Sequence, residues 1–254
     1  MNPPLLELRH VDVIRDGRYA LSDVSLAVAQ GEKVAILGPN GCGKSTFVKL
    51  LTRELHPYAK PETDIRILGR RLWDTTELRG TLGIVSSDQR SALDPAATAL
   101  QVVASGAFAR NYLMPQDAID AELDARSRRA LEVLDVAELA DRRFSRLSSG
   151  QSQRVMIARA FVNEPQTYVL DEPCAALDIG ARTSVRAAIR TLVRGGAGLL
   201  LATHDFDDIV PEITRVLFLR DGTFVADGPR ERLLQPPALA EFFGVDVAHF
   251  SHGV

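Results

Sequence analysis

Apolar and polar residues alternate along the chain in patterns that predict strands and helices in turn. Two alternating runs between residues 5 and 28 flank Asp16-Gly17, which is typical of an antiparallel hairpin. Short apolar runs predict further strands, and the almost continuously apolar residues 167–171 indicate a parallel strand buried on both faces. These further strands are predicted at residues 33–37, 65–68, 82–85, 167–171, 198–203 and, as a final hairpin, 216–225.

Apolar residues at intervals of three and four predict helices between several of these strands. The helices are predicted at residues 44–52, within 96–140 and above all at 117–134, then at about 151–162, 182–193 and 239–243. This alternation predicts an α/β fold with a mainly parallel sheet, an N-terminal antiparallel β subdomain and an inserted α-helical subdomain. We expect a single domain over residues 1–254, with its α/β core at about 1–90 and 160–254 and its helical subdomain at about 91–159.

A glycine-rich segment between the strand at 33–37 and the helix at 44–52 matches the pattern Gly-x-x-x-x-Gly-Lys-[Ser/Thr]. It consists of Gly38, Pro39, Asn40, Gly41, Cys42, Gly43, Lys44, Ser45 and Thr46. At such a strand-to-helix turn, backbone N–H groups converge on phosphate oxygens and the helix N-terminus adds the positive end of its dipole. Lys44 is expected to reach the β- and γ-phosphates, and the Ser45 hydroxyl to ligate Mg²⁺. The sequence therefore predicts nucleotide binding on a P-loop NTPase core.

Charge and composition narrow the expected partners. The 254 residues include 30 basic and 33 acidic side chains, and the net charge of -3 gives no reason to expect nucleic acid or anionic lipid. Two cysteines, Cys42 and Cys174, provide neither a disulfide framework nor metal-ligand spacing, so a reducing cytoplasm is expected. No apolar run approaches the roughly 18 residues of a membrane span, and the first residues do not resemble a signal peptide. Any role at a membrane is therefore expected to be peripheral.

Further motifs follow the phosphate loop, namely Leu147-Ser148-Ser149-Gly150-Gln151, Leu170-Asp171-Glu172-Pro173, Ala176-Leu177-Asp178 and His204. In this order and approximate spacing, the chain resembles ABC-transporter ATP-binding subunits over essentially its whole length. The resemblance implies that Asp171 holds Mg²⁺, that Glu172 is the general base for the attacking water, and that His204 contacts the γ-phosphate. It also implies that Asp178 links the two sites of a dimer. The chemistry agrees, because phosphoryl transfer needs charge neutralisation and an aligned water, and a carboxylate beside the metal supplies that alignment.

Ser148 has two compatible interpretations. With Gln151 three residues later, it forms the pattern of a helix-capping box, which requires no ligand. In the family, this segment, here Ser148, Gly150 and Gln151, faces the γ-phosphate held by the other subunit, and a capped helix N-terminus is a place where an anion binds. Ser149 replaces the usual first glycine of the segment, a mild change if Ser149 has helical dihedral angles.

Two positions depart from the family pattern. The aromatic residue that stacks on adenine is replaced by Arg15, whose planar guanidinium group can also stack on a base, and Tyr19 follows four residues later. The glutamine expected directly after the strand at 82–85 is displaced to Gln89. Gln89 is our candidate for the catalytic contact with metal and water, and Ser87 is the alternative.

The resemblance implies a Mg²⁺-dependent ATPase that forms a head-to-tail homodimer with composite ATP sites. It would energise membrane permease subunits from the inner, cytoplasmic face of the cell membrane, without contacting the transported substrate or nucleic acid. The Val85-Ser86-Ser87 sequence and the segment at 242–247 resemble those of subunits for molybdate, iron-chelate or cobalamin uptake, so a metal oxyanion or metal chelate is the expected cargo. The alternative is a soluble ABC-type accessory or regulatory ATPase without a permease, as in iron–sulfur assembly.

Overall fold

The computed structural model describes residues 3–114 and 116–250, and the chain divides into two compact units. The first unit consists of the residues up to Leu72 and those from Leu200 onward, whereas the second runs from Trp73 to Leu199. The predicted helical segment at 91–159 lies wholly inside the second unit. That unit also contains strands at 82–85 and 167–171, which the sequence analysis assigned to the core.

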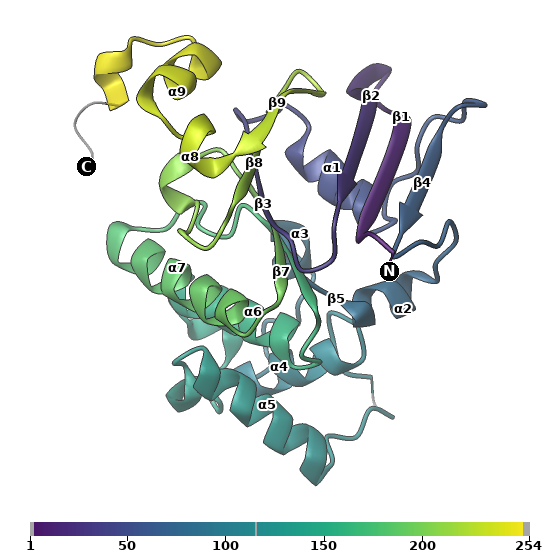
Figure 1. The fold of residues 1–254 in the computed structure, drawn as a ribbon. Helices are drawn as coiled ribbons and strands as arrows, with labels where there is room; N and C mark the ends of the chain where they lie inside the picture. The colour runs from purple at the N-terminus through teal and green to yellow at the C-terminus, as the bar shows by residue number, and fades with distance from the viewer. Residues whose placement is uncertain (1–2, 115, 251–254) are drawn as a thin grey trace. The chain divides into compact units, whose positions relative to one another are not determined.

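A small antiparallel sheet begins the first unit. Its strands β1 (Leu6–Arg15), β2 (Arg18–Val28) and β4 (Asp64–Ile67) lie side by side in the order β2-β1-β4 (Figure 1). Leu6 pairs with Val28 on one side and with Ile67 on the other. In the turn, Asp16 and Gly17 have φ angles of 50° and 74°, a left-handed conformation that Gly adopts freely and Asp tolerates. The predicted hairpin around Asp16-Gly17 is confirmed.

A second sheet in the first unit carries the phosphate loop. Its strands in this unit lie in the order β7-β3-β8-β9. They are β7 (Gly198–Thr203), β3 (Lys33–Leu37), β8 (Arg215–Arg220) and β9 (Thr223–Pro229). Only the part of β7 from Leu200 onward belongs to the first unit. β3 and β8 are parallel, whereas β8 and β9 form an antiparallel hairpin. Helix α1 (Lys44–Leu51) follows the loop, and its Phe47 ring contacts the edge of Phe224, with 5.5 Å between the ring centroids. The buried apolar strand β3 and helix α1 therefore fix both ends of the loop.

Two short helices, α8 (Arg230–Leu233) and α9 (Pro236–Phe243), follow β9 in the first unit. Phe242 of α9 stacks on Phe218 of β8, with 4.1 Å between ring centroids, and the Arg220 guanidinium group lies over the Phe242 ring. The helix predicted at 239–243 begins earlier, at Pro236, because proline fits the first turn of a helix well. This packing attaches the last described helices to β8.

The second unit combines two parallel strands with a group of helices. Strands β5 (Leu82–Val85) and β6 (Thr167–Asp171) pair in parallel, with Leu82 beside Thr167. The helices are α2 (Thr75–Thr81), α3 (Ser87–Ser91), α4 (Ala99–Ala107), α5 (Ala121–Val133), α6 (Ser149–Phe161) and α7 (Ile179–Arg194). Helix α6 packs against α4, α5 and α7 (Figure 1), and its Val155 and Ile157 are wholly buried. Across the described part of the chain, none of the helices combines the length and apolar character needed to span a bilayer.

Aspartate side chains determine where several of these helices begin. Asp120 accepts a hydrogen bond from the Leu123 N–H group and starts α5 at Ala121, so this helix is shorter than the predicted 117–134. Asp178 likewise starts α7 at Ile179, before the predicted start at 182. Asp74 caps α2, which the apolar pattern did not predict because this helix buries little more than Leu78. The capping side chains therefore set helix boundaries that differ from those predicted from the apolar periodicity.

Candidate functional site

The phosphate loop in the first unit is shaped by close approaches to two of its glycines. The Gly38 N–H group donates to the carbonyl oxygen of Thr203, with 3.2 Å between N and O. A Cβ atom on Gly38 would lie 2.3 Å from the Leu219 carbonyl oxygen, and one on Gly43 would lie 2.5 Å from the Ala20 carbonyl oxygen. Gly43 also has a φ of 114°, which side-chain-bearing residues rarely adopt. Only glycine fits these two positions without movement of the backbone.

Lys44 lies inside this loop at the first position of α1. Its side chain is 5% exposed, and its ammonium group donates to the carbonyl oxygens of Gly38 and Pro39 at 2.7 and 3.0 Å. These carbonyl groups are neutral, whereas a phosphate oxygen offers a full negative charge and roughly twice the hydrogen-bond strength. Lys44 is therefore positioned to bind a phosphate that enters the loop.

The N-terminus of α1 faces the same loop. Gly43 occupies its cap position and provides no side-chain hydrogen bond, so the first N–H groups of the helix can serve a phosphate. Ser45 is exposed, whereas Thr46 is buried, so the Ser45 hydroxyl is the one that a metal ion can reach. The other loop positions are Asn40 and Gly41, which are exposed, and Cys42, which is buried and accepts a hydrogen bond from the Gly222 N–H group.

His204 lies at the same strand end as the loop. It directly follows Thr203, whose carbonyl oxygen receives the Gly38 N–H group. Thr203 is wholly buried, and its hydroxyl accepts a hydrogen bond from the Asp205 N–H group at 3.1 Å, which fixes the backbone around His204. His204 itself is exposed. The first unit thus brings His204 beside the loop, and its contact with a γ-phosphate stays a prediction.

Arg15 and Tyr19 lie at the tip of the β1–β2 hairpin. Arg15 pairs with Arg18, and Tyr19, which is 57% exposed, precedes Ala20. The Ala20 carbonyl oxygen is the atom that approaches Gly43 of the phosphate loop. The hairpin tip therefore adjoins the loop, and both side chains stay candidates for stacking on a base.

The acidic pair Asp171-Glu172 ends β6 in the second unit. Asp171 is 6% exposed, and Glu172 has a φ of 51°, the left-handed conformation that costs roughly 1–2 kcal/mol in a residue other than glycine. The Glu172 carbonyl oxygen accepts a hydrogen bond from the Ala175 N–H group at 3.1 Å, which helps to hold this turn. The backbone thus turns directly after β6 at Glu172, and the catalytic role of this residue stays a prediction.

Ser148 caps α6, and the predicted capping box is confirmed. The Ser148 hydroxyl accepts a hydrogen bond from the Gln151 N–H group at 3.3 Å, and the Gln151 Oε1 atom accepts one from the Ser148 N–H group at 3.0 Å. Ser149 is the first helical residue, so replacing glycine there is the mild change that we expected. Ser148 is exposed at the end of this helix.

Gly150 is buried against α7, a contact that the sequence did not reveal. A Cβ atom on Gly150 would lie 2.7 Å from the Cβ atom of Ala181. The Ala181 N–H group in turn donates to the Asp178 carboxylate at 2.8 Å. Within the second unit, Ala181 therefore joins the Ser148–Gln151 segment to Asp178.

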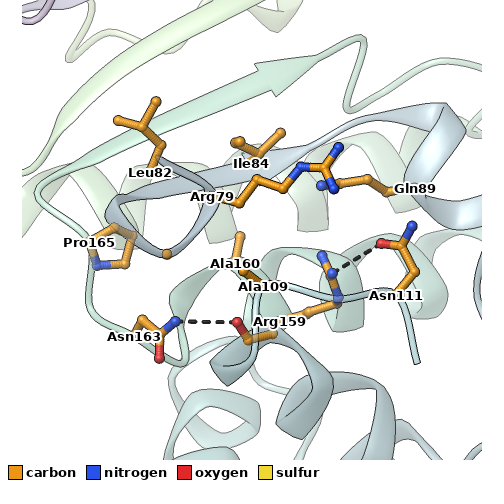
Figure 2. A pocket seen from close by; sticks show the side chains of 12 residues that line it. Arg79, Leu82, Ile84, Gln89, Ala109, Asn111, Arg159, Ala160, Asn163 and Pro165 are labelled. Atoms are coloured by element: carbon orange, nitrogen blue, oxygen red, sulfur yellow. Dashed lines mark hydrogen bonds between the residues drawn. The ribbon is translucent and has the colours of Figure 1, made fainter. Parts of the chain in front are cut away.

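Gln89 lies on α3 and lines a pocket together with Arg79 and Arg159 (Figure 2). Ser87 begins α3, but its side chain lies outside the described residues. A contact of either residue with metal and water stays a prediction. Arg159 is a functional candidate that the sequence analysis missed, and its signal was a single charge within the otherwise apolar run 155–161.

Comparison with known proteins identifies the family of the chain. The family profile described as "ABC transporter" matches residues 21–175. The spermidine/putrescine import ATP-binding protein PotA of Haemophilus influenzae (strain 86-028NP) is 33% identical over 249 residues, which cover 96% of this chain and 63% of PotA. The molybdenum import ATP-binding protein ModC of Mycobacterium tuberculosis (strain CDC 1551 / Oshkosh) is 35% identical over 240 residues, or 91% of this chain and 62% of ModC. The chain thus spans less than two thirds of either protein.

Solved structures confirm the predicted α/β fold. A bacterial ABC transporter cassette in a dimeric structure matches with a TM-score of 0.73 and 28% identity, over 88% of this chain and 98% of that chain. The matched family region contains the phosphate loop, the Ser148–Gln151 segment and Asp171-Glu172. The profile covers more than half of the chain, so this protein belongs to the ABC transporter family.

Proposed function

We propose that this chain is the ATP-hydrolysing subunit of a membrane importer. The observation that carries the proposal is the Lys44-containing loop together with Asp171-Glu172 in a member of the ABC transporter family. Gly38 and Gly43 let the loop backbone pack closely against its neighbours, which holds the loop in its turn, and the uncapped N-terminus of α1 adds N–H donors. The residues present therefore fit the phosphates of ATP.

Ser45 and Asp171 are the oxygen donors that would hold Mg²⁺, a cation that proteins usually bind through one or two side chains together with substrate phosphates. When bound, it neutralises charge on the β- and γ-phosphates. Gln89 or Ser87 would complete the contact with the metal and the attacking water. Ser45 is exposed and Asp171 ends a strand, which agrees with these assignments.

Hydrolysis requires a water aligned with the γ-phosphate and a group that accepts its proton. Lys44 binds the phosphates, and Glu172 orients the water and accepts the proton. His204 donates a hydrogen bond to the γ-phosphate as negative charge develops there. Arg15, with Tyr19 close by in the chain, stacks on the base.

A second copy of the chain would complete each site. Ser148, Gly150 and Gln151 lie at the N-terminus of α6, where the helix dipole favours an anion. In a head-to-tail homodimer, this end of one subunit faces the γ-phosphate held by Lys44 of the other. The dimeric structure of a cassette that is 28% identical supports the formation of a dimer.

The partner of the dimer would be a pair of permease subunits at the inner, cytoplasmic face of the cell membrane. The second unit has an open groove with about 460 Å³ of free space, lined by Arg90, Ser91, Leu93, Pro95, Phe144, Ser145 and Leu147. Its four apolar lining residues and single positive charge suit an amphipathic segment of a permease. We propose this groove as the docking surface for the permease, and we propose that the permease rather than this chain contacts the transported substrate.

A metal oxyanion or a metal chelate is the cargo that we propose, because the Val85-Ser86-Ser87 sequence and the segment at 242–247 resemble those of subunits for such cargoes. ModC, named for molybdenum import, is 35% identical to this chain. PotA, named for import of the cationic polyamines spermidine and putrescine, is 33% identical. These two relatives are named for very different cargoes but are almost equally similar to this chain. This agrees with a transporter in which other subunits select the cargo. Uptake assays with the permease encoded beside this chain would test the cargo, and accumulation of polyamine without molybdate would contradict it.

The substitution Glu172→Gln tests the hydrolysis mechanism. The variant should bind MgATP, hydrolyse it about 100-fold more slowly because its amide cannot accept a proton, and accumulate as an ATP-bound dimer. Adding Ser148→Arg should return it to a monomer, because the long side chain blocks the phosphate contact at α6. Thr191→Arg is the matched control and should leave the dimer intact. Thr191 is exposed near the C-terminal end of α7. A Glu172→Gln variant that stays monomeric in excess MgATP would contradict the composite site.

Purification from detergent-solubilised membranes tests the permease. The tagged chain should retain a polytopic membrane protein, and Ser145→Arg, which fills the groove, should lose it, whereas Thr191→Arg should not. Recovery of the chain only from the soluble fraction, without a membrane protein, would favour the accessory ATPase.

A further inference from the structure

The turn between β8 and β9 makes hydrogen bonds to two other parts of the first unit. It consists of Asp221 and Gly222, and both residues have positive φ angles, 47° and 76°. The Gly222 N–H group donates to the Cys42 carbonyl oxygen in the phosphate loop, with 2.9 Å between N and O. The Gly222 carbonyl oxygen accepts a hydrogen bond from the Ser22 N–H group of β2, also at 2.9 Å. Gly222 therefore connects the phosphate loop to β2 through its backbone alone.

The Ala20 carbonyl group of β2 approaches both this turn and the phosphate loop. A Cβ atom on Gly222 would lie 2.9 Å from the Ala20 carbonyl oxygen, and one on Gly43 would lie 2.5 Å from the same atom. A backbone carbonyl cannot swing aside as the end of a flexible side chain can, so a side chain at position 222 would push β2 away. Gly222 is also buried, and its φ is one that glycine adopts freely. Glycine at this position thus permits three backbone segments to pack closely.

Arg215 attaches the β8–β9 hairpin to β2 at a second point. It donates to the Ala27 carbonyl oxygen and to Glu32 Oε1, each at 3.0 Å, and to the two Asp227 carboxylate oxygens at 2.7 and 2.6 Å. The hydrogen bond to Asp227, and then the one to Glu32, raise the pKa of Arg215 above its ordinary value, although burial lowers it. The hairpin therefore holds β2 at both Ser22 and Ala27.

These contacts set the spacing between the two ends of the proposed nucleotide site. Arg15 and Tyr19, the candidates for stacking on a base, are carried by the hairpin whose second strand contains Ser22. The phosphates are assigned to the loop that contains Cys42. A ligand with both a base and phosphates gains fully from both contacts only if their spacing is fixed beforehand, because otherwise part of the binding energy is used to order the protein.

We propose that Gly222 is a positioning residue for nucleotide recognition, which holds the base-stacking hairpin at the spacing that a nucleoside triphosphate requires. This inference rests on the proposed function, which places phosphates at Lys44 and a base at Arg15. The phosphate loop is fixed at its two ends by β3 and α1, whereas the tip of the β1–β2 hairpin is exposed. Displacement at Gly222 therefore moves the hairpin rather than the loop, and it weakens the binding of ligands that carry a base.

Titration calorimetry with two ligands tests this role. The ligands are MgATP and the magnesium complex of ribose 5-triphosphate, which has the sugar and phosphates of ATP without the base. Gly222→Ala should weaken MgATP binding about 10-fold, the scale of a lost base-stacking contact, and should leave the affinity for ribose 5-triphosphate unchanged. Retained binding of ribose 5-triphosphate shows at the same time that the variant is folded.

Gly31→Ala is the matched control. Gly31 has the same φ of 76°, but no described residue beyond its chain neighbours comes within 4 Å of an added Cβ atom. The control variant thus has the same backbone strain without pressure on β2, and it should bind both ligands like the wild type. Gly222→Asn is a second test variant, because asparagine tolerates a positive φ and its Cβ atom meets the same Ala20 carbonyl group. It should show the same selective loss.

The possible failures are distinguishable. An equal loss for both ligands in Gly222→Ala and Gly222→Asn, wild-type MgATP affinity in both, or a selective loss also in Gly31→Ala would overturn the positioning role. A wild-type chain that binds ribose 5-triphosphate as tightly as MgATP would overturn it too, because no base contact would then exist to position. A wild-type chain that binds neither ligand would contradict the proposed function itself.

Discussion

Gly150 of α6 and Ala181 of α7 approach so closely that a Cβ atom on Gly150 would lie 2.7 Å from the Cβ atom of Ala181. The contact joins the helix that begins with Ser148 to the helix that Asp178 caps. Both helices belong to the same packed unit, so this contact sets how closely they can approach each other.

The first prediction follows from this contact. Gly150→Ala should destabilise the chain by about 1–3 kcal/mol, because the added methyl group forces α6 and α7 apart. Gly180→Ala, at an open position of α7 where an added Cβ meets only ordinary contact, should be neutral or stabilise by about 0.5–1 kcal/mol. Urea unfolding of both variants measures the free energies. Equal stability of the two variants would show that the helices can separate without cost.

The second prediction concerns Lys44, which donates to Gly38 and Pro39 within the phosphate loop. Lys44→Ala should weaken MgATP binding about 10- to 100-fold, since a hydrogen bond to a charged group contributes about 1.5–3 kcal/mol. Lys49→Ala, in the last turn of the same helix, is the control and should bind like the wild type. Isothermal titration measures both affinities. Wild-type affinity in Lys44→Ala would remove this loop from the nucleotide site.

The third prediction is a pH dependence at Asp12. Burial raises the pKa of Asp12, but the hydrogen bond from the Asp23 N–H group and the ion pair with Lys60 outweigh it, so the pKa lies below its ordinary value of 3.8. The carboxylate therefore contributes stability that is present above pH 3.8 and is lost as the pH falls through the lower, folded-state pKa. Acid should weaken the β1–β2 sheet for this reason.

Asp12→Asn should accordingly destabilise the chain by about 1–3 kcal/mol at pH 7, and the difference from the wild type should shrink below pH 3.8. Asp16→Asn makes the same change at the exposed hairpin turn, where Asn tolerates the positive φ, and should have little effect. Unfolding curves at several pH values provide the measurement. A difference that stays constant down to pH 2 would contradict the role of the ionised carboxylate.

The fourth prediction compares the two candidates after β5. Gln89→Ala should lower Mg²⁺-dependent ATPase activity more than Ser87→Ala, because only the amide side chain is long enough to approach both metal and water. Steady-state hydrolysis, with nucleotide affinity measured separately, ranks the variants. The reverse ranking would assign this contact to Ser87.

Much of the architecture was predictable because its signals are local. Alternation around Asp16-Gly17 encodes a hairpin, and the glycine spacing before Lys44 encodes a strand-to-helix turn. The capping box of Ser148 and Gln151 also depends on residues three apart, so it was visible in the chain. The order of the motifs then identified the family that the comparisons confirm.

The sequence by itself therefore determined most of the strands and helices, the phosphate loop and the family, since each depends on residues close together in the chain. Only the tertiary structure revealed why Gly150 must be glycine, because Ala181 comes from another helix. It also brought Arg79, Gln89 and Arg159 to one pocket from three separate helices. Packing over long sequence separations decides such contacts, and no local pattern of apolar and polar residues encodes them.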